Sequence, residues 1–187
     1  MILQEKPKIE IYCGDCLNLG LNIDYKNWVL MTSAPYVDKS MNWLLNFNRY
    51  VIWGFPYFKD IQANGWIIWD KQPDMYDRMD RKEFPTGKYV EMASTTLWQG
   101  LDIYKVKWEW YERKGGSYVY DHPSQQPSEI YEIPINEWTN KDDIIFDPYM
   151  GCGSAGVAAK KCGRDFIGVE INQSYFDIAR KRLLAGG

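Results

Sequence analysis

Short apolar runs bounded by turn residues recur along the 187 residues of this chain. Each run has the length of a strand, and stretches with the apolar spacing of helices separate several of them. This alternation predicts an α/β fold with a mainly parallel sheet that helices cover on both faces. The expected strands are Lys8–Tyr12, Trp28–Thr32, Tyr50–Trp53, Trp66–Trp69, Val106–Tyr111, Ile144–Phe146 and Phe166–Ile171.

Three segments between or after these runs are expected as helices. Asp38 is a candidate N-cap for a helix that continues to Phe47. Small residues from Ser154 onward suit the start of a second helix, and Asn172–Leu184 has one apolar side. The segments expected as a charged loop and as an extended connector are Asp70–Lys88 and His122–Pro127.

The stretch 144–159 has the clearest chemical meaning. An apolar run ends at Asp147, and a turn with Gly151 and Gly153 leads into the small residues of the next helix. Glycine allows close approach of a ligand to the backbone, and a helix N-terminus presents free N–H groups to an anion. A second apolar run ends at Glu170, an acid placed to accept hydrogen bonds from ribose hydroxyls. This order predicts a nucleotide-type cofactor pocket.

Composition narrows the choice of partners only slightly. Aromatic residues make up 16% of the chain, and such side chains both fill cores and stack on bases. The net charge of −3 gives no global attraction to phosphate, so contact with nucleic acid would depend on local basic clusters. The clusters Arg78–Lys88 and Lys105–Lys114 are candidates, and solvated faces are the alternative explanation for each.

Four cysteines in this sequence are expected to be reduced thiols. Cys13 and Cys16 have the C-x-x-C spacing of a zinc or redox site, but zinc needs two further ligands. The remaining candidates, Cys152, Cys162 and His122, lack the usual zinc spacing, so we expect no metal. The sequence shows neither a signal-peptide pattern nor a membrane-spanning run, and we therefore expect a cytoplasmic protein without membrane contact.

Three segments carry recognisable motifs. Asp147–Ser154 has the sequence D-P-Y-M-G-C-G-S, Ser33–Tyr36 is S-A-P-Y, and His122–Pro127 is H-P-S-Q-Q-P. They resemble the DPF-x-G-x-G-[ST] motif, the [DNS]-P-P-[YF] catalytic loop and the HPTQKP connector of the DNA amino-methyltransferases. Smaller matches are Gly14-Asp15, Trp53-Gly54, Trp69-Asp70-Lys71, Gly168-Val169-Glu170, Tyr175 and Arg182-Leu183.

The resemblance covers essentially the whole chain. Its motif order, with the catalytic loop first and the cofactor motif last, is that of the permuted β arrangement of this family. The resemblance implies a Rossmann-like S-adenosylmethionine-dependent methyltransferase fold with circularly permuted motifs, in a small phage- or prophage-like form. It also implies methyl transfer to the exocyclic amino group of a DNA base, adenine N6 or cytosine N4.

The resemblance assigns a catalytic role to the loop. The amino nitrogen of a base is a poor nucleophile because its lone pair is conjugated with the ring, and acceptors for the amino protons would free it. In the family these acceptors are the first side chain of the loop and the following carbonyl, here Ser33 and the carbonyl of Ala34. Tyr36 would stack on a base flipped out of the duplex, and Pro35 would stiffen the loop.

The resemblance also implies a set of cofactor-binding residues. Glu170 would bind the ribose hydroxyls, and Asp15 would reach the adenine or amino end of S-adenosylmethionine. Ser124 and Gln125 of the connector would hold the methionine carboxylate. The residues expected around the methionine part are Asp147, Tyr149, Gly151, Gly153 and Ser154.

Two positions depart from the family pattern and point to weak or altered activity. Ala34 replaces the first proline of the catalytic loop, and Gln126 replaces the lysine of the connector. Serine at position 33 is common among relatives that act on cytosine N4, whereas aspartate marks adenine N6. The sequence therefore does not decide between adenine and cytosine as the target base.

Once the motifs are placed, no separate block remains for a target-recognition domain. Only Lys71–Lys88 and Gln99–Tyr120 are left to read bases, so we expect a single domain over residues 1–187. Specificity would be low or completed by a second subunit, for which a homodimer is one solution.

An active DNA methyltransferase is the favoured function. The alternatives are an inactive relative that binds cofactor or DNA, and a methyltransferase acting on RNA or a small molecule.

Overall fold

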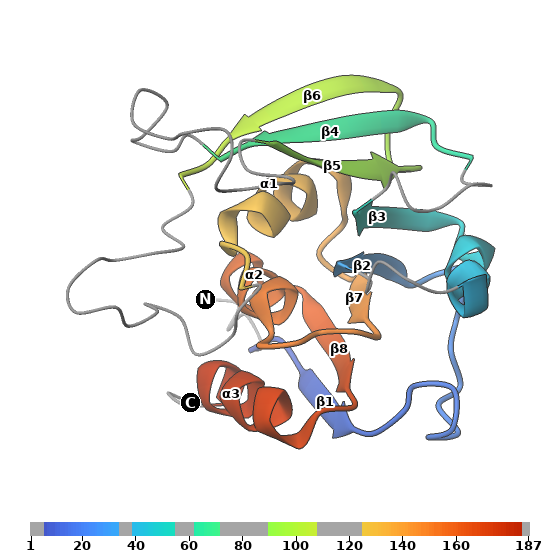
Figure 1. Cartoon of the computed structure of the whole chain (residues 1–187), viewed down its shortest axis with the longest axis vertical. Helices are drawn as coiled ribbons and strands as arrows, with labels where there is room; N and C mark the ends of the chain where they lie inside the picture. The colour runs from blue at the N-terminus through green and yellow to red at the C-terminus, as the bar shows by residue number, and fades with distance from the viewer. Residues whose placement is uncertain (1–5, 34–38, 55–61, 72–89, 108–124, 185–187) are drawn as a thin grey trace, which may run out of the picture.

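The apolar runs pair into one sheet in the computed structural model, which describes residues 6–33, 39–54, 62–71, 90–107 and 125–184. Its strands are β1 (Ile9–Cys13), β2 (Val29–Ser33), β3 (Arg49–Trp53), β4 (Gly65–Asp70), β5 (Val90–Thr95), β6 (Gly100–Lys105), β7 (Ile144–Asp147) and β8 (Asp165–Glu170). The strand order is β1-β8-β7-β2-β3-β5-β4-β6 (Figure 1).

The sheet is mainly parallel, as predicted. β5 runs antiparallel to β3 and β4, while every other neighbouring pair is parallel. The two antiparallel steps cancel, so β4 and β6 point in the same direction as β3. The carboxyl ends of all described strands except β5 therefore meet at one edge of the sheet, where open α/β sheets bind their ligands.

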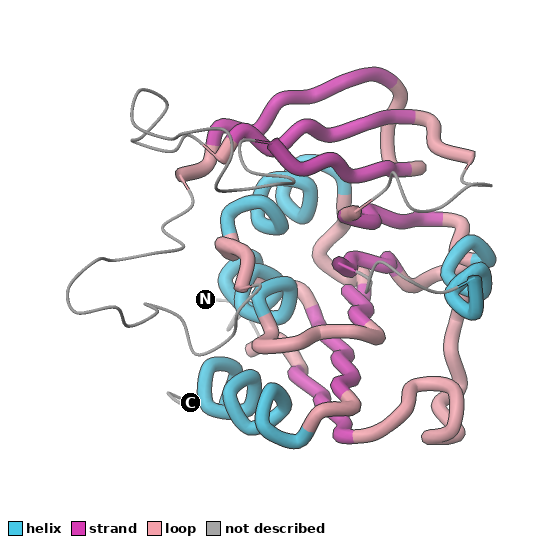
Figure 2. The backbone as a smooth tube through the Cα atoms, in the orientation of Figure 1, coloured by secondary structure: helices cyan, strands magenta, loops and turns pink. Residues whose placement is uncertain are grey.

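Helices cover both faces of this sheet. The α-helices α1 (Glu129–Trp138), α2 (Ser154–Cys162) and α3 (Gln173–Leu184) lie on one side, and the 3₁₀ helix η1 (Lys39–Asn46) lies on the other (Figures 1 and 2). Alternate residues of β2 serve the two faces. Val29 and Met31 pack toward the α-helices, and Leu30 packs toward η1. The described part contains no helix that is long and apolar enough to cross a bilayer.

Aromatic side chains contribute strongly to both layers of the core. Trp53 and Trp69 are fully buried and meet edge to face, with ring centroids 6.2 Å apart. On the other face, Phe47 stacks on Phe146 at 5.7 Å. Much of the aromatic content in the described part is thus explained by packing.

The structure confirms most of the predicted elements and corrects others. The strand expected at Val106–Tyr111 is wrong for its described residues, because Val106 and Lys107 follow the end of β6. The helix expected before Phe47 is 3₁₀, and its candidate cap Asp38 lies outside the described residues, as do 72–88 of the expected loop. The sequence patterns did not predict β5, β6 or α1; α1 carries Pro134 in its interior, which argues against a helix.

Candidate active site

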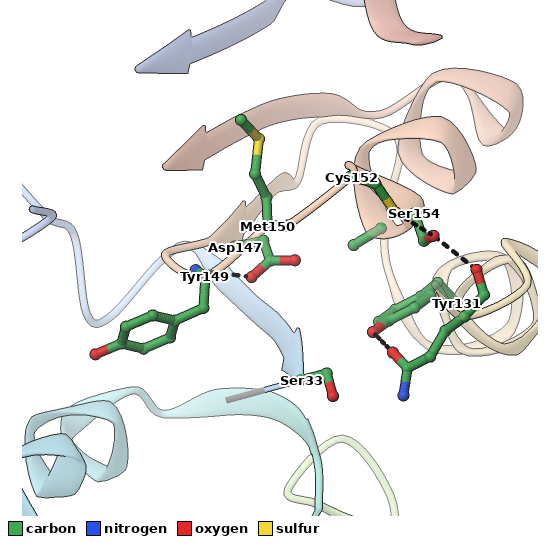
Figure 3. Close-up of a pocket in the computed structure, with 10 residues that line it drawn as sticks. Ser33, Tyr131, Asp147, Tyr149, Met150, Cys152 and Ser154 are labelled. Carbon is green, nitrogen blue, oxygen red and sulfur yellow. Dashed lines mark hydrogen bonds between the residues drawn. The ribbon is translucent and has the colours of Figure 1, made fainter. Parts of the chain in front are cut away.

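A cleft opens at the carboxyl edge of the sheet, between β2, β7 and the turn that leads into α2. Its volume is about 410 Å³ when the space that opens to solvent is counted. Predicted site residues from both ends of the chain meet here, because β2 pairs directly with β7. The lining residues are Ser33, Gln126, Tyr131, Asp147, Tyr149, Met150, Gly151, Cys152, Ser154 and Ala155 (Figure 3).

Asp147 supplies a buried carboxylate to this cleft and is only 3% exposed. The Thr32 hydroxyl donates to its Oδ1 at 2.7 Å, and the Tyr149 N–H donates to the same oxygen at 3.1 Å. Burial raises the pKa of Asp147 to about 7; the charge of Glu170 acts in the same direction, and the two hydrogen bonds oppose it. A cation bound in the cleft would favour the ionised carboxylate.

The predicted glycine turn is present, and its two glycines have left-handed backbone angles. Gly151 has φ +53° and lines the cleft, and Gly153 has φ +81°. A Cβ on Gly153 would lie 3.2 Å from side-chain atoms of Ala179 and Leu183 in α3. Gly153 is therefore needed for the turn and for packing against α3, and the structure does not place it among the cleft-lining residues.

Glu170 supports the turn from the end of β8. Its Oε2 accepts the N–H of Gly151 at 2.9 Å, and its Oε1 accepts the N–H of Asn172 at 2.7 Å. The side chain is largely buried and does not line the cleft. Each carboxylate oxygen has a second lone-pair site, which is the capacity left for the predicted ribose hydroxyls.

Asp15 lies at the same edge of the sheet, after β1. The Gly14 N–H donates to the Glu170 carbonyl at 2.9 Å, and this bond holds the end of β1 next to the end of β8. The exposed Asp15 carboxylate accepts the N–H of Leu17 at 3.0 Å and the side-chain amide of Asn18 at 2.7 Å. Asp15 thus stabilises a turn beside the site, and it is not part of the cleft wall.

The connector reaches the cleft through Gln126. Its backbone carbonyl accepts the Ser154 hydroxyl at 2.6 Å, so Ser154 joins the connector to α2. The side chain of Gln126 accepts the Tyr131 hydroxyl at 2.5 Å and donates to Glu91 Oε1 at 2.8 Å. Tyr131 was not predicted as a site residue, since α1 itself was missed. Gln125 does not line this cleft and lies in a separate groove beside it.

Glutamine, rather than the family lysine, fits the charges that surround position 126. Glu91 Oε2 lies 3.1 Å from Nζ of Lys71, which is 6% exposed and sits 4.8 Å from the centre of the Trp69 ring. A lysine at position 126 would place a second cation next to a carboxylate that is already paired. The neutral amide instead satisfies both Glu91 and Tyr131.

Ser33, the first predicted residue of the catalytic loop, ends β2 and lines the cleft. Figure 3 shows the Asp147 carboxylate between Ser33 and the turn that carries Cys152 and Ser154. The other predicted residues of the catalytic loop and connector, namely Ala34, Pro35, Tyr36 and Ser124, lie outside the described residues.

Arg182 from α3 contacts the glycine turn. The sequence alone indicated no role for it beyond a smaller match to the family pattern. Its Nη1 donates to the Cys152 carbonyl at 2.6 Å and lies 3.1 Å from the Cys152 sulfur. Nη1 also lies 3.5 Å from the Ser154 hydroxyl. A charged hydrogen bond of this kind holds the turn peptide in one orientation.

The C-x-x-C pair is split between two environments. The Cys13 thiol donates to the Gln173 side chain at 3.3 Å, and Cys16 is buried in the core on the η1 side. Burial raises the pKa of Cys16 to about 11, with smaller contributions from Asp15 and Asp147. Within the described ranges, no group of three or more metal-ligating side chains is found.

Both a family model and individual relatives of known function match this chain. The N6/N4 methyltransferase family model, described as DNA methylase, matches residues 48–181. The Type II methyltransferase M2.LlaDCHI of Lactococcus lactis subsp. cremoris is 34% identical over 125 residues, covering 64% of this chain and 42% of that protein. M2.DpnII of Streptococcus pneumoniae is 36% identical over 126 residues, covering 64% and 41%. The chain therefore spans less than half the length of these relatives.

Solved structures resemble the fold over nearly the whole chain. The crystal structure of an M1.HpyAVI–SAM complex aligns with a TM-score of 0.67 and 25% identity, covering 94% of this chain and 100% of that one. The cytosine-N4-specific PvuII DNA methyltransferase aligns with a TM-score of 0.64, covering 98% of this chain and 90% of that one. At 17% identity, the second likeness concerns the fold alone. The predicted Rossmann-like methyltransferase fold is confirmed.

The raised pKa of Asp147 predicts a pH-dependent stability in the absence of ligand. The native protein keeps a proton that the unfolded chain loses above its ordinary carboxyl pKa of about 4, so stability falls as pH rises toward 7. Asp147→Asn should match the wild type near pH 4 and exceed it at pH 8, by on the order of a few kcal/mol. Urea unfolding across this range measures the difference.

The matched control is Asp142→Asn, which changes an exposed carboxylate just before β7. Its unfolding free energy should run parallel to that of the wild type. Parallel curves for Asp147→Asn as well would show that Asp147 is ionised at neutral pH in the free protein.

Proposed function

Because the chain belongs to the N6/N4 DNA methylase family, we propose that it transfers a methyl group from S-adenosylmethionine to the exocyclic amino group of a DNA base. Adenine N6 and cytosine N4 are the two targets. The observation that carries the proposal is the cleft at the carboxyl edge, where Ser33 from the catalytic-loop strand and Asp147 from the cofactor motif line one space. This arrangement supports the proposal, because the transfer would need an acceptor for the amino group and a pocket for the methyl donor next to each other.

On the cofactor side, the residues divide by the charge that they attract. The buried Asp147 carboxylate is suited to the ammonium group of the methionine part, which would ionise it fully. The start of α2, at Ser154, and the connector residues Ser124 and Gln125 are suited to the carboxylate. Glu170 and Asp15 stand at the ends of β8 and β1, where the ribose and the adenine or amino end would lie.

On the base side, the Ser33 hydroxyl and the carbonyl of Ala34 would each accept a hydrogen bond from the amino group. Drawing these protons away from the plane of the base frees the lone pair for an in-line displacement at the methyl group. Stacking by Tyr36 and stiffening by Pro35 complete this proposal. Serine rather than aspartate at position 33 leaves the choice between adenine and cytosine to experiment.

An active enzyme is preferred over an inactive relative because of the Gln126 network. The hydrogen bonds of Gln126 to Glu91 and Tyr131 hold the connector against the cleft without the family lysine. Replacement of the family lysine therefore does not by itself argue for an inactive protein, because the connector keeps buried polar contacts beside the cleft. The likeness to Type II methyltransferases favours DNA, in a restriction–modification setting, over RNA or a small molecule.

We further propose one methyltransferase domain over residues 1–187, a cytoplasmic location and a homodimer. All described strands belong to one sheet, which supports the single domain. Among the described residues no strand pairs with the outer edge of β6, where Leu101 and Ile103 are 59% and 58% exposed. Exposed apolar residues on an edge strand favour pairing with a second copy.

If that edge forms the dimer, Ile103→Lys should reduce the mass measured by sedimentation to that of one chain, because a charge would be buried in the contact. Leu17→Lys, at another exposed apolar position, serves as the control. A wild-type protein that sediments as a single chain at high concentration would exclude the dimer.

The proposed activity is tested by incubating the protein with labelled S-adenosylmethionine and unmethylated DNA, followed by mass spectrometry of the nucleosides. We expect N6-methyladenine or N4-methylcytosine, and a loss of rate of about tenfold or more in Ser33→Ala. Ser174→Ala, exposed at the start of α3, should keep the wild-type rate. Cofactor binding without any methylated base would identify an inactive relative.

The hydrogen bond from Arg182 to the glycine turn predicts that loss of this side chain weakens the binding of S-adenosylmethionine. Arg182→Gln removes the charged hydrogen bond to the Cys152 carbonyl, and calorimetry should show S-adenosylmethionine binding weakened about tenfold or more. Arg180→Gln changes an exposed arginine of the same helix and should bind normally. Equal affinities for the two variants would make Arg182 a residue of helix packing only.

A further inference from the structure

A chain of buried polar side chains runs along one wall of the cofactor cleft, and we propose that two of its members, Tyr131 and Glu91, are positioning residues for S-adenosylmethionine. Neither side chain touches the reacting atoms. Both act through the side-chain amide of Gln126, which lies between them on the cleft wall. The inference rests on the proposed function, because it concerns the site for the methyl donor.

Glu91 reaches this wall because β5 runs antiparallel to its neighbours. The first residues of β5 therefore lie at the carboxyl edge of the sheet, where Glu91 pairs with Trp69, the last residue but one of β4. Lys71 follows β4 directly, and its Nζ lies 3.1 Å from Glu91 Oε2. This ion pair presents Glu91 to the connector as a carboxylate, with one oxygen on Lys71 and the other on Gln126.

The charge on Glu91 decides which way the Gln126 amide points. A carboxylate only accepts hydrogen bonds, whereas an amide has one donating end and one accepting end. Nε2 of Gln126 must therefore face Glu91, to which it donates at 2.8 Å. Oε1 is then turned toward α1, where it accepts the hydroxyl of Tyr131 at 2.5 Å. The reversed orientation would set two acceptors against each other, so the network holds the amide in one orientation.

Holding this amide also holds the connector backbone at the cleft. The carbonyl of Gln126 accepts the hydroxyl of Ser154, the first residue of α2 after the glycine turn, at 2.6 Å. Tyr131 is 2% exposed and packs edge to face on Trp53, with ring centroids 6.3 Å apart, so the ring that carries the hydroxyl is fixed. The wall is thus formed before the cofactor arrives, and a preformed site costs less ordering on binding.

Tyr131→Phe tests this role, because it keeps the aromatic ring and removes only the donor to Gln126. Calorimetry should show the Kd for S-adenosylmethionine raised about fivefold or more, since the amide loses the partner of its oxygen. The lost hydroxyl lies away from the reacting atoms, so kcat at saturating cofactor should stay within about twofold of the wild type and the loss should fall on KM.

The matched control is Tyr50→Phe. Tyr50 is 3% exposed, and its hydroxyl donates to the carbonyl of Gln62 at 3.1 Å. It is the second residue of β3 and therefore lies toward the amino edge of the sheet, away from the cleft. Each variant loses one hydrogen bond of a buried tyrosine, so the melting temperature should fall by a similar small amount in both. Only Tyr131→Phe should lose affinity for S-adenosylmethionine.

A second variant shows whether Tyr131 and Glu91 act through one group. In Glu91→Gln the introduced amide would keep its oxygen on Lys71 and turn its nitrogen toward Gln126, which reverses the Gln126 amide. This variant alone should weaken cofactor binding. Glu91→Gln/Tyr131→Phe should bind no more weakly than the weaker single variant, because the orientation is lost only once. Effects that multiply in the double variant would mean independent action and would overturn the shared role.

The outcomes separate this inference from the proposed activity. If Tyr131→Phe binds S-adenosylmethionine as the wild type does, or if Tyr50→Phe loses as much affinity, the positioning role is wrong and the proposed methyl transfer stands. If Tyr131→Phe weakens binding as expected but the wild type methylates no base, the positioning role stands and the proposed methyl transfer is wrong. A wild type that does not bind S-adenosylmethionine overturns both.

Discussion

The hydrogen bond from the Thr32 hydroxyl to the Asp147 carboxylate joins two segments that are 115 positions apart in the chain. It forms because β2 and β7 are parallel neighbours, so their carboxyl ends reach the same edge together. Ser33 follows Thr32 directly, and the glycine turn follows Asp147. Fixing this one buried contact therefore sets the distance between the proposed base side and the proposed cofactor side, which methyl transfer requires to be constant.

Lys71 and Asp147 are both buried ionisable groups at or beside the cleft, and their surroundings differ. Lys71 is paired with Glu91, and that carboxylate also accepts a hydrogen bond from Gln126, so the cost of burial is offset within the protein. Among the described residues, the donors to Asp147 are the neutral Thr32 hydroxyl and Tyr149 N–H, and burial raises the pKa of Asp147 to about 7. The first arrangement holds the connector in place. The second leaves an unmet demand for a cation in the cleft, which a ligand can satisfy.

How much of this was predictable depends on the range of the interactions. The strand ending at Asp147, the turn at Gly151 and the helix Asn172–Leu184 follow from local periodicity and turn chemistry, and the structure confirms them. α1 was missed because an internal proline outweighs a short apolar pattern.

The contacts between distant segments were not predictable in the same way. The Arg182–Cys152 bond and the Gln126 network join elements that only the fold brings together. The role of Gly153 is similar: its sequence context suggests approach to a ligand, but its Cα faces α3 closely, a constraint that exists only after α3 packs on the turn. The family motifs include Gln126, Gly153 and Arg182, and tertiary packing determines which neighbours each of them contacts.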